Sequence, residues 1–211
     1  MDTPVFEPLT EPVTHLLYLH GFRSSPLSQK ARQVGERVAR EHPGVTWWCP
    51  PLPPSPREAM GLVTAGVAGW PRARMAVVGS SLGGFYARWL ALHTGCRAAL
   101  LNPAPRPADS LAAHIGEHST WQKPDEHFFF EARFVDELRA QEADIARLAP
   151  QHPATPERLF ALIARGDELL DWREMQAFAA GGQIRLLEHS DHAISDFDQH
   201  IDALFAFLRL A

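Results

Sequence analysis

Short apolar runs alternate with amphipathic segments along most of the chain. Runs of five or six mostly apolar residues without a helical period are typical of strands buried on both faces of a parallel sheet. Such runs predict strands at residues 14–19, 45–49, 74–78, 97–101, 159–164 and 183–187. Apolar residues spaced three or four apart predict helices at residues 28–41, 57–69, 82–93, 131–148, 172–179 and 197–210.

Strands that alternate with helices predict an α/β fold, a mostly parallel sheet of about six strands with helices on both faces. Neither an internal repeat nor a linker divides the sequence, so residues 1–211 are expected to form a single domain. Residues 103–157 interrupt the alternation, because ordinary connections take only about 2–6 residues. We expect this segment to be a small helical cap insertion. Its aromatic residues, Trp121 and the run 127–130, either line an apolar substrate site or pack the cap onto the body.

Prolines dominate residues 50–56 and break the pattern before the third strand. Such a segment is either a polyproline ligand for a partner or a stiff loop that leads into the next helix. Pro56 favours the loop, because proline is well placed at the first position of a helix.

Composition narrows the class of protein. The formal net charge of the 211 residues is -5, which argues against a broad nucleic-acid surface. No apolar run approaches the roughly 20 residues of a membrane span, and residues 1–7 lack the basic start of a signal peptide. The two cysteines, Cys49 and Cys96, are expected to be buried free thiols. Together these features predict a cytoplasmic protein.

The strand at 74–78 leads into a Gly-x-Ser-x-Gly sequence, Gly79 to Gly83, and then into a helix. This context predicts a nucleophile elbow, a tight turn that lifts the hydroxyl of Ser81 above the edge of the sheet. Side chains at positions 79 and 83 would collide with the turn, and glycine has none. The alternative is a purely structural small-residue turn.

A serine hydroxyl needs an adjacent base, and the base needs a carboxylate that orients it. Asp167 follows the fifth predicted strand and His192 follows the sixth. The carboxyl ends of parallel strands meet at one edge, so we expect Ser81, Asp167 and His192 to converge there. Other carboxylates lie close by in the sequence, and Asp171 is expected to cap the following helix instead.

An oxyanion hole would complete such a site. The backbone N–H of Leu82, directly after the nucleophile, is one expected donor. The second is expected from the N–H of Phe22, in the loop after the first strand, where Gly21 allows close approach of the backbone. His20 is expected to order this loop rather than to act as a second base.

With these residues the chain resembles the α/β-hydrolase superfamily, and more narrowly the small YqiA-like esterases. The resemblance rests on segments 18–22, 24–26, 79–84, 102–104, 106–107, 166–168 and 192–193, which follow one another in the same order. It implies hydrolysis of carboxyl esters or acyl-CoA thioesters by a Ser81–His192–Asp167 triad, with no cofactor and a small-molecule partner. Asp191 departs from the pattern, because related proteins carry Asn there, and this leaves the working pH open.

Two other functions compete with this interpretation. His114 and His118 fit a His-x-x-Glu-His pattern, in which a zinc hydrolase places both histidines on one helix face. Gly116 weakens such a helix, and no motif supplies a third ligand, so we expect no metal site here. The other alternative is a binding protein that keeps the fold without catalysis, although no member of the predicted triad is missing. The oligomeric state is left open.

Overall fold

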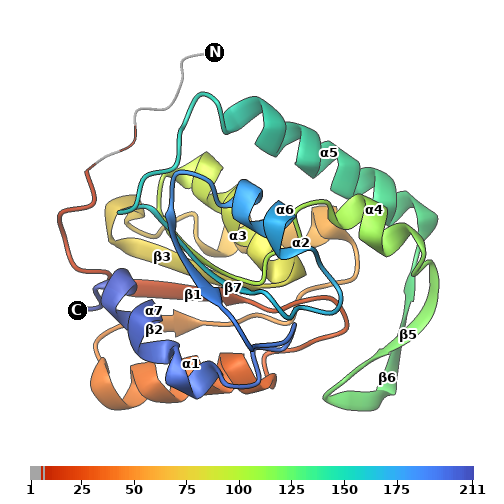
Figure 1. Ribbon diagram of the computed structural model, residues 1–211, viewed down its shortest axis with the longest axis horizontal. Helices are drawn as coiled ribbons and strands as arrows, with labels where there is room; N and C mark the ends of the chain where they lie inside the picture. The colour runs from red at the N-terminus through yellow and green to blue at the C-terminus, as the bar shows by residue number, and fades with distance from the viewer. Residues whose placement is uncertain (1–5, 7) are drawn as a thin grey trace.

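A six-stranded parallel sheet forms the centre of the molecule in the computed structural model, which describes residue 6 and residues 8–211 (Figure 1). The strands are β1 (His15–Leu19), β2 (Thr46–Trp48), β3 (Met75–Ser80), β4 (Arg97–Leu101), β7 (Leu159–Ala164) and β8 (Gln183–Leu187). Their order in the sheet is β2-β1-β3-β4-β7-β8. The predicted fold class is confirmed. Of the opening segment 1–7, for which the sequence predicts no signal peptide, only Phe6 lies within the described residues.

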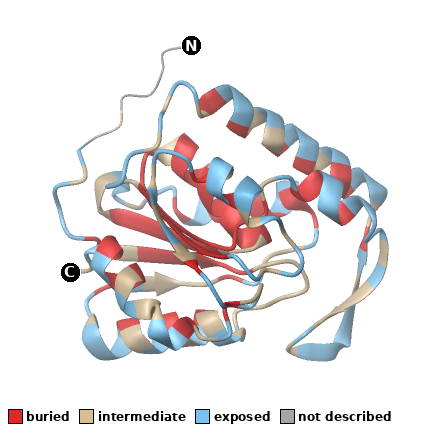
Figure 2. Cartoon of the chain, viewed as in Figure 1, coloured by how far each residue is buried: buried red, intermediate tan, exposed pale blue. Residues whose placement is uncertain are grey.

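Helices cover both faces of this sheet. They are α1 (Gln29–Glu41), α2 (Pro56–Gly66), α3 (Leu82–Thr94), α4 (Pro107–Ala112), α5 (Ala132–Leu148), α6 (Trp172–Phe178) and α7 (Ile201–Leu208). Alternate residues of each strand point to opposite faces. Leu16 and Tyr18 of β1 therefore join the core beneath α1 and α7, while Leu17 and Leu19 join the core beneath α2, α3 and α5. The buried residues in Figure 2 follow these two layers.

The strand order reverses between β1 and β3, because the chain runs outward from β1 to β2 and then returns to the other side of β1. Ligands of open α/β sheets bind beyond the carboxyl ends of the strands at such a reversal. The loops after β1 and β3 are therefore well placed to form a site.

Residues 103–157 differ from the wholly helical insertion that the sequence predicts. An antiparallel hairpin of β5 (Gly116–Thr120) and β6 (Lys123–Phe130) lies between α4 and α5. The first five residues of β6 are all exposed, so it lacks the apolar runs by which buried strands are recognised. In Figure 1 the hairpin stands out from the body beside the helical layer.

The structure differs from the prediction in smaller ways at the ends of some elements and in the burial of one cysteine. Pro56 begins α2 as predicted, and the Oγ of Ser55 caps it by accepting from the N–H of Glu58. The segment 197–210 is divided into a 3-10 turn, Phe197–Gln199, and α7. Both cysteines are free thiols, but only Cys96 is buried, whereas Cys49 is partly exposed. No helix in the described part of the chain is long and apolar enough to cross a membrane.

Candidate active site

Ser81 occupies the sharp turn between β3 and α3 with a left-handed backbone, φ 55°. This conformation is uncommon for a residue with a side chain, so the surroundings must hold it in place. The N–H of Ser81 donates to the carbonyl of Leu101 at 2.9 Å, and its own carbonyl accepts from Gly84 at 2.9 Å and Ala104 at 3.1 Å. Backbone hydrogen bonds on both sides of the turn therefore fix the position of the hydroxyl.

The two elbow glycines are sterically required. A Cβ on Gly79 would lie 2.0 Å from the carbonyl oxygen of Gly83, and a Cβ on Gly83 would lie 2.0 Å from that of Leu19. Neither obstacle is a flexible side-chain end, so both positions need the absence of a side chain. Gly83 thereby lets the start of α3 approach the end of β1.

The structure brings Ser81, His192 and Asp167 together in one line of hydrogen bonds. The Oγ of Ser81 lies 3.1 Å from Nε2 of His192, and Nδ1 of His192 lies 2.7 Å from Oδ2 of Asp167. The Asp167 side chain is fully buried, while that of His192 is 18% exposed. The imidazole can thus accept the serine proton at one nitrogen and donate to the carboxylate at the other.

The neighbouring carboxylates have other partners. The second oxygen of Asp167, Oδ1, accepts from the N–H groups of Leu169 at 2.9 Å and Leu170 at 2.8 Å. Asp171 caps α6, as predicted, by accepting from the N–H of Arg173 at 2.9 Å. Asp191 accepts from both the N–H and the hydroxyl of Ser195, and these hydrogen bonds lower the pKa of its carboxyl.

Asn102 is a structural part of the site that the sequence analysis did not identify. Its fully buried side chain donates to the carbonyls of Asp191 at 3.0 Å and His192 at 3.1 Å, and it accepts from the N–H of Ala164 at 2.7 Å. It follows β4 with φ 42° and joins the loops after β7 and β8. In the sequence Asn102 is a polar residue directly after the apolar residues 98–101, which does not show what its side chain binds.

Two further side chains hold the loop that carries His192. Glu168 accepts from the backbone N–H of His192 at 3.0 Å. Lys30, from α1, donates to the carbonyl of Ala193. Burial lowers the pKa of Lys30 to about 8, and the nearby carboxylates of Asp191 and Asp167 counteract this effect. The sequence analysis missed both contacts, because each joins a side chain to a backbone group that lies far away in the chain.

The loop after β1 lies against the elbow. A Cβ on Gly21 would come within 3.2 Å of the Cβ of Ser81, so a side chain there would crowd the serine. Neither the N–H of Phe22 nor that of Leu82 donates to another group in the described part of the chain. His20, which is only 5% exposed, accepts from the N–H of Leu52 at Nε2 and contacts the carbonyl of Gly21 through Nδ1.

A cavity of about 560 Å³ lies above these groups and is lined by Ser81, His192, Lys30, Leu111, Trp121 and Leu170 among others. The hairpin reaches it at its tip. The N–H of Trp121 donates to the carbonyl of Arg23 at 2.9 Å, and the Arg23 guanidinium lies 4.1 Å from the centre of the Trp121 ring. Trp121 therefore lines this cavity, whereas Phe128 and Phe130 pack against Phe22.

The zinc pattern does not have the helix that it needs. His118 lies in β5, and His114 precedes that strand in a turn. The Nε2 of His118 lies 2.6 Å from the backbone carbonyl of His114, and the ring of His118 packs against Phe22. Residues 8–211 and Phe6 contain no group of three or more His, Cys, Asp or Glu side chains that could hold a metal ion.

The sheet order and the elbow turn define the α/β-hydrolase fold, and solved structures of that class are similar over most of this chain. A metagenome-derived lipolytic enzyme of the pair LipS and LipT has 21% sequence identity and a TM-score of 0.69, covering 94% of this chain and 95% of its own. Est1E from Butyrivibrio proteoclasticus has 15% identity and a TM-score of 0.67, over 94% and 88% of the two chains. Mouse alpha/beta hydrolase domain-containing protein 10 has 17% identity and a TM-score of 0.62, over 92% and 90%.

Within this class the chain belongs to the Uncharacterised protein family (UPF0227), whose model matches residues 15–209. The match includes the elbow, both loops that carry Asp167 and His192, and the hairpin. The resemblance to YqiA-like proteins that the sequence predicts is confirmed.

Proposed function

We propose that this protein is a serine hydrolase that cleaves carboxyl esters or acyl-CoA thioesters. The observation that carries the proposal is the continuous line of hydrogen bonds from Ser81 through His192 to the buried carboxylate of Asp167. The resemblance of this chain in fold to a lipolytic enzyme and to Est1E is consistent with this activity.

The geometry supports a two-step reaction. His192 takes the proton of Ser81 as its oxygen attacks the substrate carbonyl, and Asp167 stabilises the imidazolium that forms. The N–H groups of Phe22 and Leu82 would bind the developing oxyanion, and the start of α3 adds a favourable dipole. His192 then gives its proton to the leaving alcohol or thiol, and an acyl group remains on Ser81. Water activated by the same histidine releases the acid.

Labelling with a fluorophosphonate probe tests the nucleophile. We expect one adduct, located on Ser81 by peptide mapping, and no adduct in Ser81→Ala. Activity of Ser81→Ala on activated esters should fall by several orders of magnitude, because removal of a triad member has that effect. Ser80→Ala is the matched control, since it removes the neighbouring hydroxyl and should keep the labelling. An adduct on Ser80, or an intact protein that neither reacts nor hydrolyses, would favour a non-catalytic binding protein.

A comparison of esters with acyl-CoA thioesters then assigns the substrate class. Both carry the carbonyl that the proposed site attacks, and they differ in the leaving group. In this scheme the protein's own groups perform each proton transfer, so we expect a chelator such as EDTA to leave the rate unchanged. Complete inactivation by EDTA that zinc reverses would contradict the proposed mechanism.

A further inference from the structure

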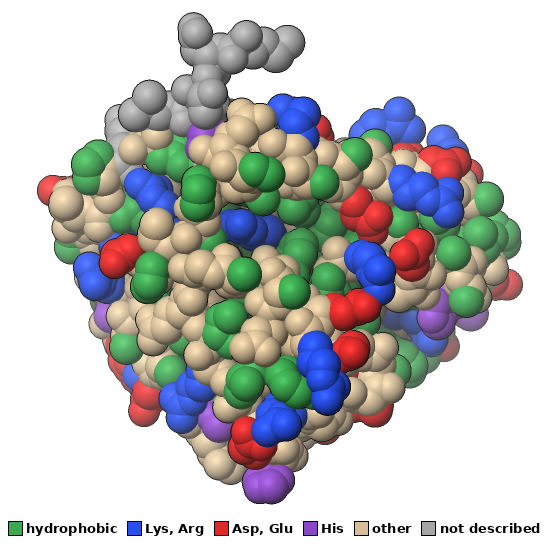
Figure 3. All heavy atoms as spheres, turned by 45° about the horizontal axis from the view of Figure 1, so that its top comes forward, with side chains coloured by type: hydrophobic (Ala, Val, Ile, Leu, Met, Phe, Trp, Pro, Cys, Tyr) green, Lys and Arg blue, Asp and Glu red, His purple; other side chains and the backbone are tan. Residues whose placement is uncertain are grey.

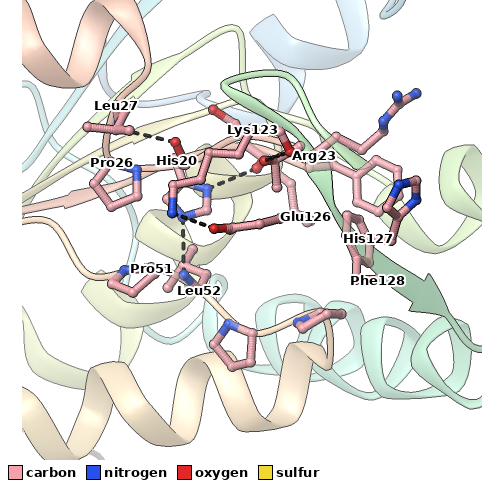
Figure 4. A pocket seen from close by; sticks show the side chains of 18 of the residues that line it. His20, Arg23, Pro26, Leu27, Pro51, Leu52, Lys123, Glu126, His127 and Phe128 are labelled. Atoms are coloured by element: carbon pink, nitrogen blue, oxygen red, sulfur yellow. Dashed lines mark hydrogen bonds and ion pairs between the residues drawn. The ribbon is translucent and has the colours of Figure 1, made fainter. Parts of the chain in front are cut away.

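Figure 4 shows a second cavity, of about 520 Å³. Residues 20–26, the loop after β1 that we call the oxyanion loop, separate this cavity from Ser81. The loop after β1, the proline-rich loop before α2 and the hairpin strand β6 form its walls. Figure 4 shows Pro26 and Leu27 on one side of His20, and His127 and Phe128 of the hairpin on the other. Residues 20–24 and Leu82 line both cavities. Among the described residues, Ser81 and His192 line only the first cavity.

The walls of this second cavity present few free polar groups. Four prolines line it, at positions 26, 51, 53 and 54, and proline has no N–H to donate. The N–H of Leu52 is already bound to His20. At the rim, Lys123 and Glu126 pair with each other at 2.6 Å. A guest here would exchange water for apolar contacts, so the cavity fits an uncharged aliphatic group.

The position of the proposed oxyanion donors connects the two cavities. A substrate carbonyl oxygen held by the N–H groups of Phe22 and Leu82 would lie where both cavities meet. The leaving group would then extend into one cavity and the acyl chain into the other. The leaving group must face His192, which protonates it, and His192 lines the first cavity. The acyl chain is then left for the second.

We propose that the cavity between the proline-rich loop and the hairpin binds the acyl chain of the substrate, and that this chain is aliphatic and uncharged. The assignment rests on the proposed hydrolase function and adds the class of acyl group to it. His20 is a positioning residue in this arrangement, because it joins the oxyanion loop to the proline-rich loop through Gly21 and Leu52.

The proposal predicts how kcat/KM depends on the length of the acyl chain. Each methylene that enters the cavity should raise kcat/KM by up to about fourfold, the value expected from burial of one such group. We expect p-nitrophenyl esters to improve from acetate through butyrate to hexanoate and octanoate, and then to reach a limit when the cavity is full.

Leu27→Trp would fill part of the cavity from an exposed position, since Leu27 is 52% exposed. The octanoate-to-acetate ratio of kcat/KM should fall up to about fifteenfold, which corresponds to two excluded methylenes at the burial value per methylene. Leu52→Ala should act in the opposite direction and move the limit to longer chains. Leu62→Trp is the matched control, because Leu62 lies on α2 at 42% exposure and lines neither cavity.

The outcomes separate the two proposals. If the wild-type protein hydrolyses no ester or thioester, both proposals fail. If it hydrolyses acetate and octanoate but Leu27→Trp keeps the ratio of the Leu62→Trp control, only the acyl-chain assignment fails. A reduced ratio in Leu169→Trp, which alters the first cavity alone, together with an unchanged ratio in Leu27→Trp, would place the acyl chain beside Ser81 and overturn the assignment.

Discussion

Asp167 and Asp171 lie four residues apart, yet their carboxylates have different partners. Asp167 bonds to His192 and is fully buried, whereas Asp171 caps α6. Asp167→Asn should lower kcat about a thousandfold or more, because an amide stabilises the wrong tautomer of the histidine. Asp171→Asn should lower the free energy of unfolding by no more than about 1 kcal/mol, since Asn also caps helices well. Measured kcat and denaturant unfolding of both variants check this, and a large loss of kcat in Asp171→Asn with a normal rate in Asp167→Asn would reverse the assignment.

Asn102 fixes the loops that carry Asp167 and His192. Asn102→Ala would leave the carbonyls of Asp191 and His192 and the N–H of Ala164 without their partner. Each buried group left unpaired costs about 1–3 kcal/mol, so the variant should be clearly destabilised. We also expect kcat to fall while KM changes little, because the substrate cavity is intact and the alignment of His192 is not.

Asn102→Gly is the matched control for this experiment. It removes the same side chain but accepts the left-handed backbone at φ 42° without strain. Equal losses of kcat in the Ala and Gly variants would assign the effect to the lost hydrogen bonds. A normal kcat in Asn102→Gly would show that the side chain has no part in alignment.

His20 links stability to pH. Burial lowers its pKa, and the hydrogen bond to the Gly21 carbonyl only partly offsets this. Between the folded value and the unfolded value near 6.5, the unfolded chain binds a proton that the folded chain does not. The contribution of neutral His20 to the free energy of unfolding is therefore fully present above about pH 6.5 and is lost as the pH falls below this value. Unfolding free energies measured from pH 7.5 to 5 should fall more steeply for the wild type than for His20→Gln, and parallel curves would contradict this.

The residues of the site differ in how far the sequence could predict them. Ser81, Asp167 and His192 follow strand ends in a recognisable order, and the structure places their side chains within hydrogen-bonding distance. Asn102 and Glu168 act on backbone groups of a distant loop, which no local pattern encodes. The sequence therefore predicts the members of the proposed triad better than the groups that hold them in position.

At the scale of single elements, the β3–α3 turn depends on its glycines. Gly83→Ala would place a Cβ 2.0 Å from the backbone oxygen of Leu19, so we expect little folded protein or a strongly lowered melting temperature. Gly61→Ala is the matched control in α2, where a Cβ meets nothing within 4 Å. It should raise the free energy of unfolding by about 0.5–1 kcal/mol, because alanine is the better helix former. Thermal unfolding of both variants decides the point, and a Gly83→Ala protein as stable as the wild type would contradict it.

The strands of the central sheet were predictable mainly from their apolar residues. The predicted bounds of β4, β7 and β8 coincide with those observed, and β4 and β7 are buried throughout. The hairpin was missed, because β6 begins with exposed polar residues and gains its order from the partner strand β5. The position of the insertion was visible in the length of the segment, but its internal structure was not.

Across the whole molecule, burial predicts an order of local stability. The central strands are buried except for Ser80 at the end of β3, while β6 is largely exposed and β5 is mostly half-buried, as Figure 2 shows. Amides in elements with few buried contacts open most easily. Hydrogen exchange followed by mass spectrometry should therefore find residues 75–80, 97–101 and 159–164 slowest and residues 116–127 among the fastest. Protection of the hairpin equal to that of β3 would contradict this order.

The distribution of charge on the surface bears on the nucleic-acid binding against which the composition argues, and that expectation stays a prediction. Acidic and basic side chains are intermixed on the face in Figure 3, which has no extended basic patch. Neither thiol is expected to react readily, because burial raises the pKa of Cys49 to about 12 and that of Cys96 to about 11. The fold class and the central parallel sheet were evident from the sequence at this scale, since they follow from the alternation of elements.

The hairpin departs from and returns to the body within one insertion, between the strands β4 and β7. None of Ser81, Asp167 and His192 lies on it, although its tip lines the first cavity and β6 lines the second. Under the proposed function, the reacting groups and the cavity walls therefore come from different parts of the chain. A library that varies only residues 116–130 would then change the walls of the cavities while every member keeps Ser81, Asp167 and His192.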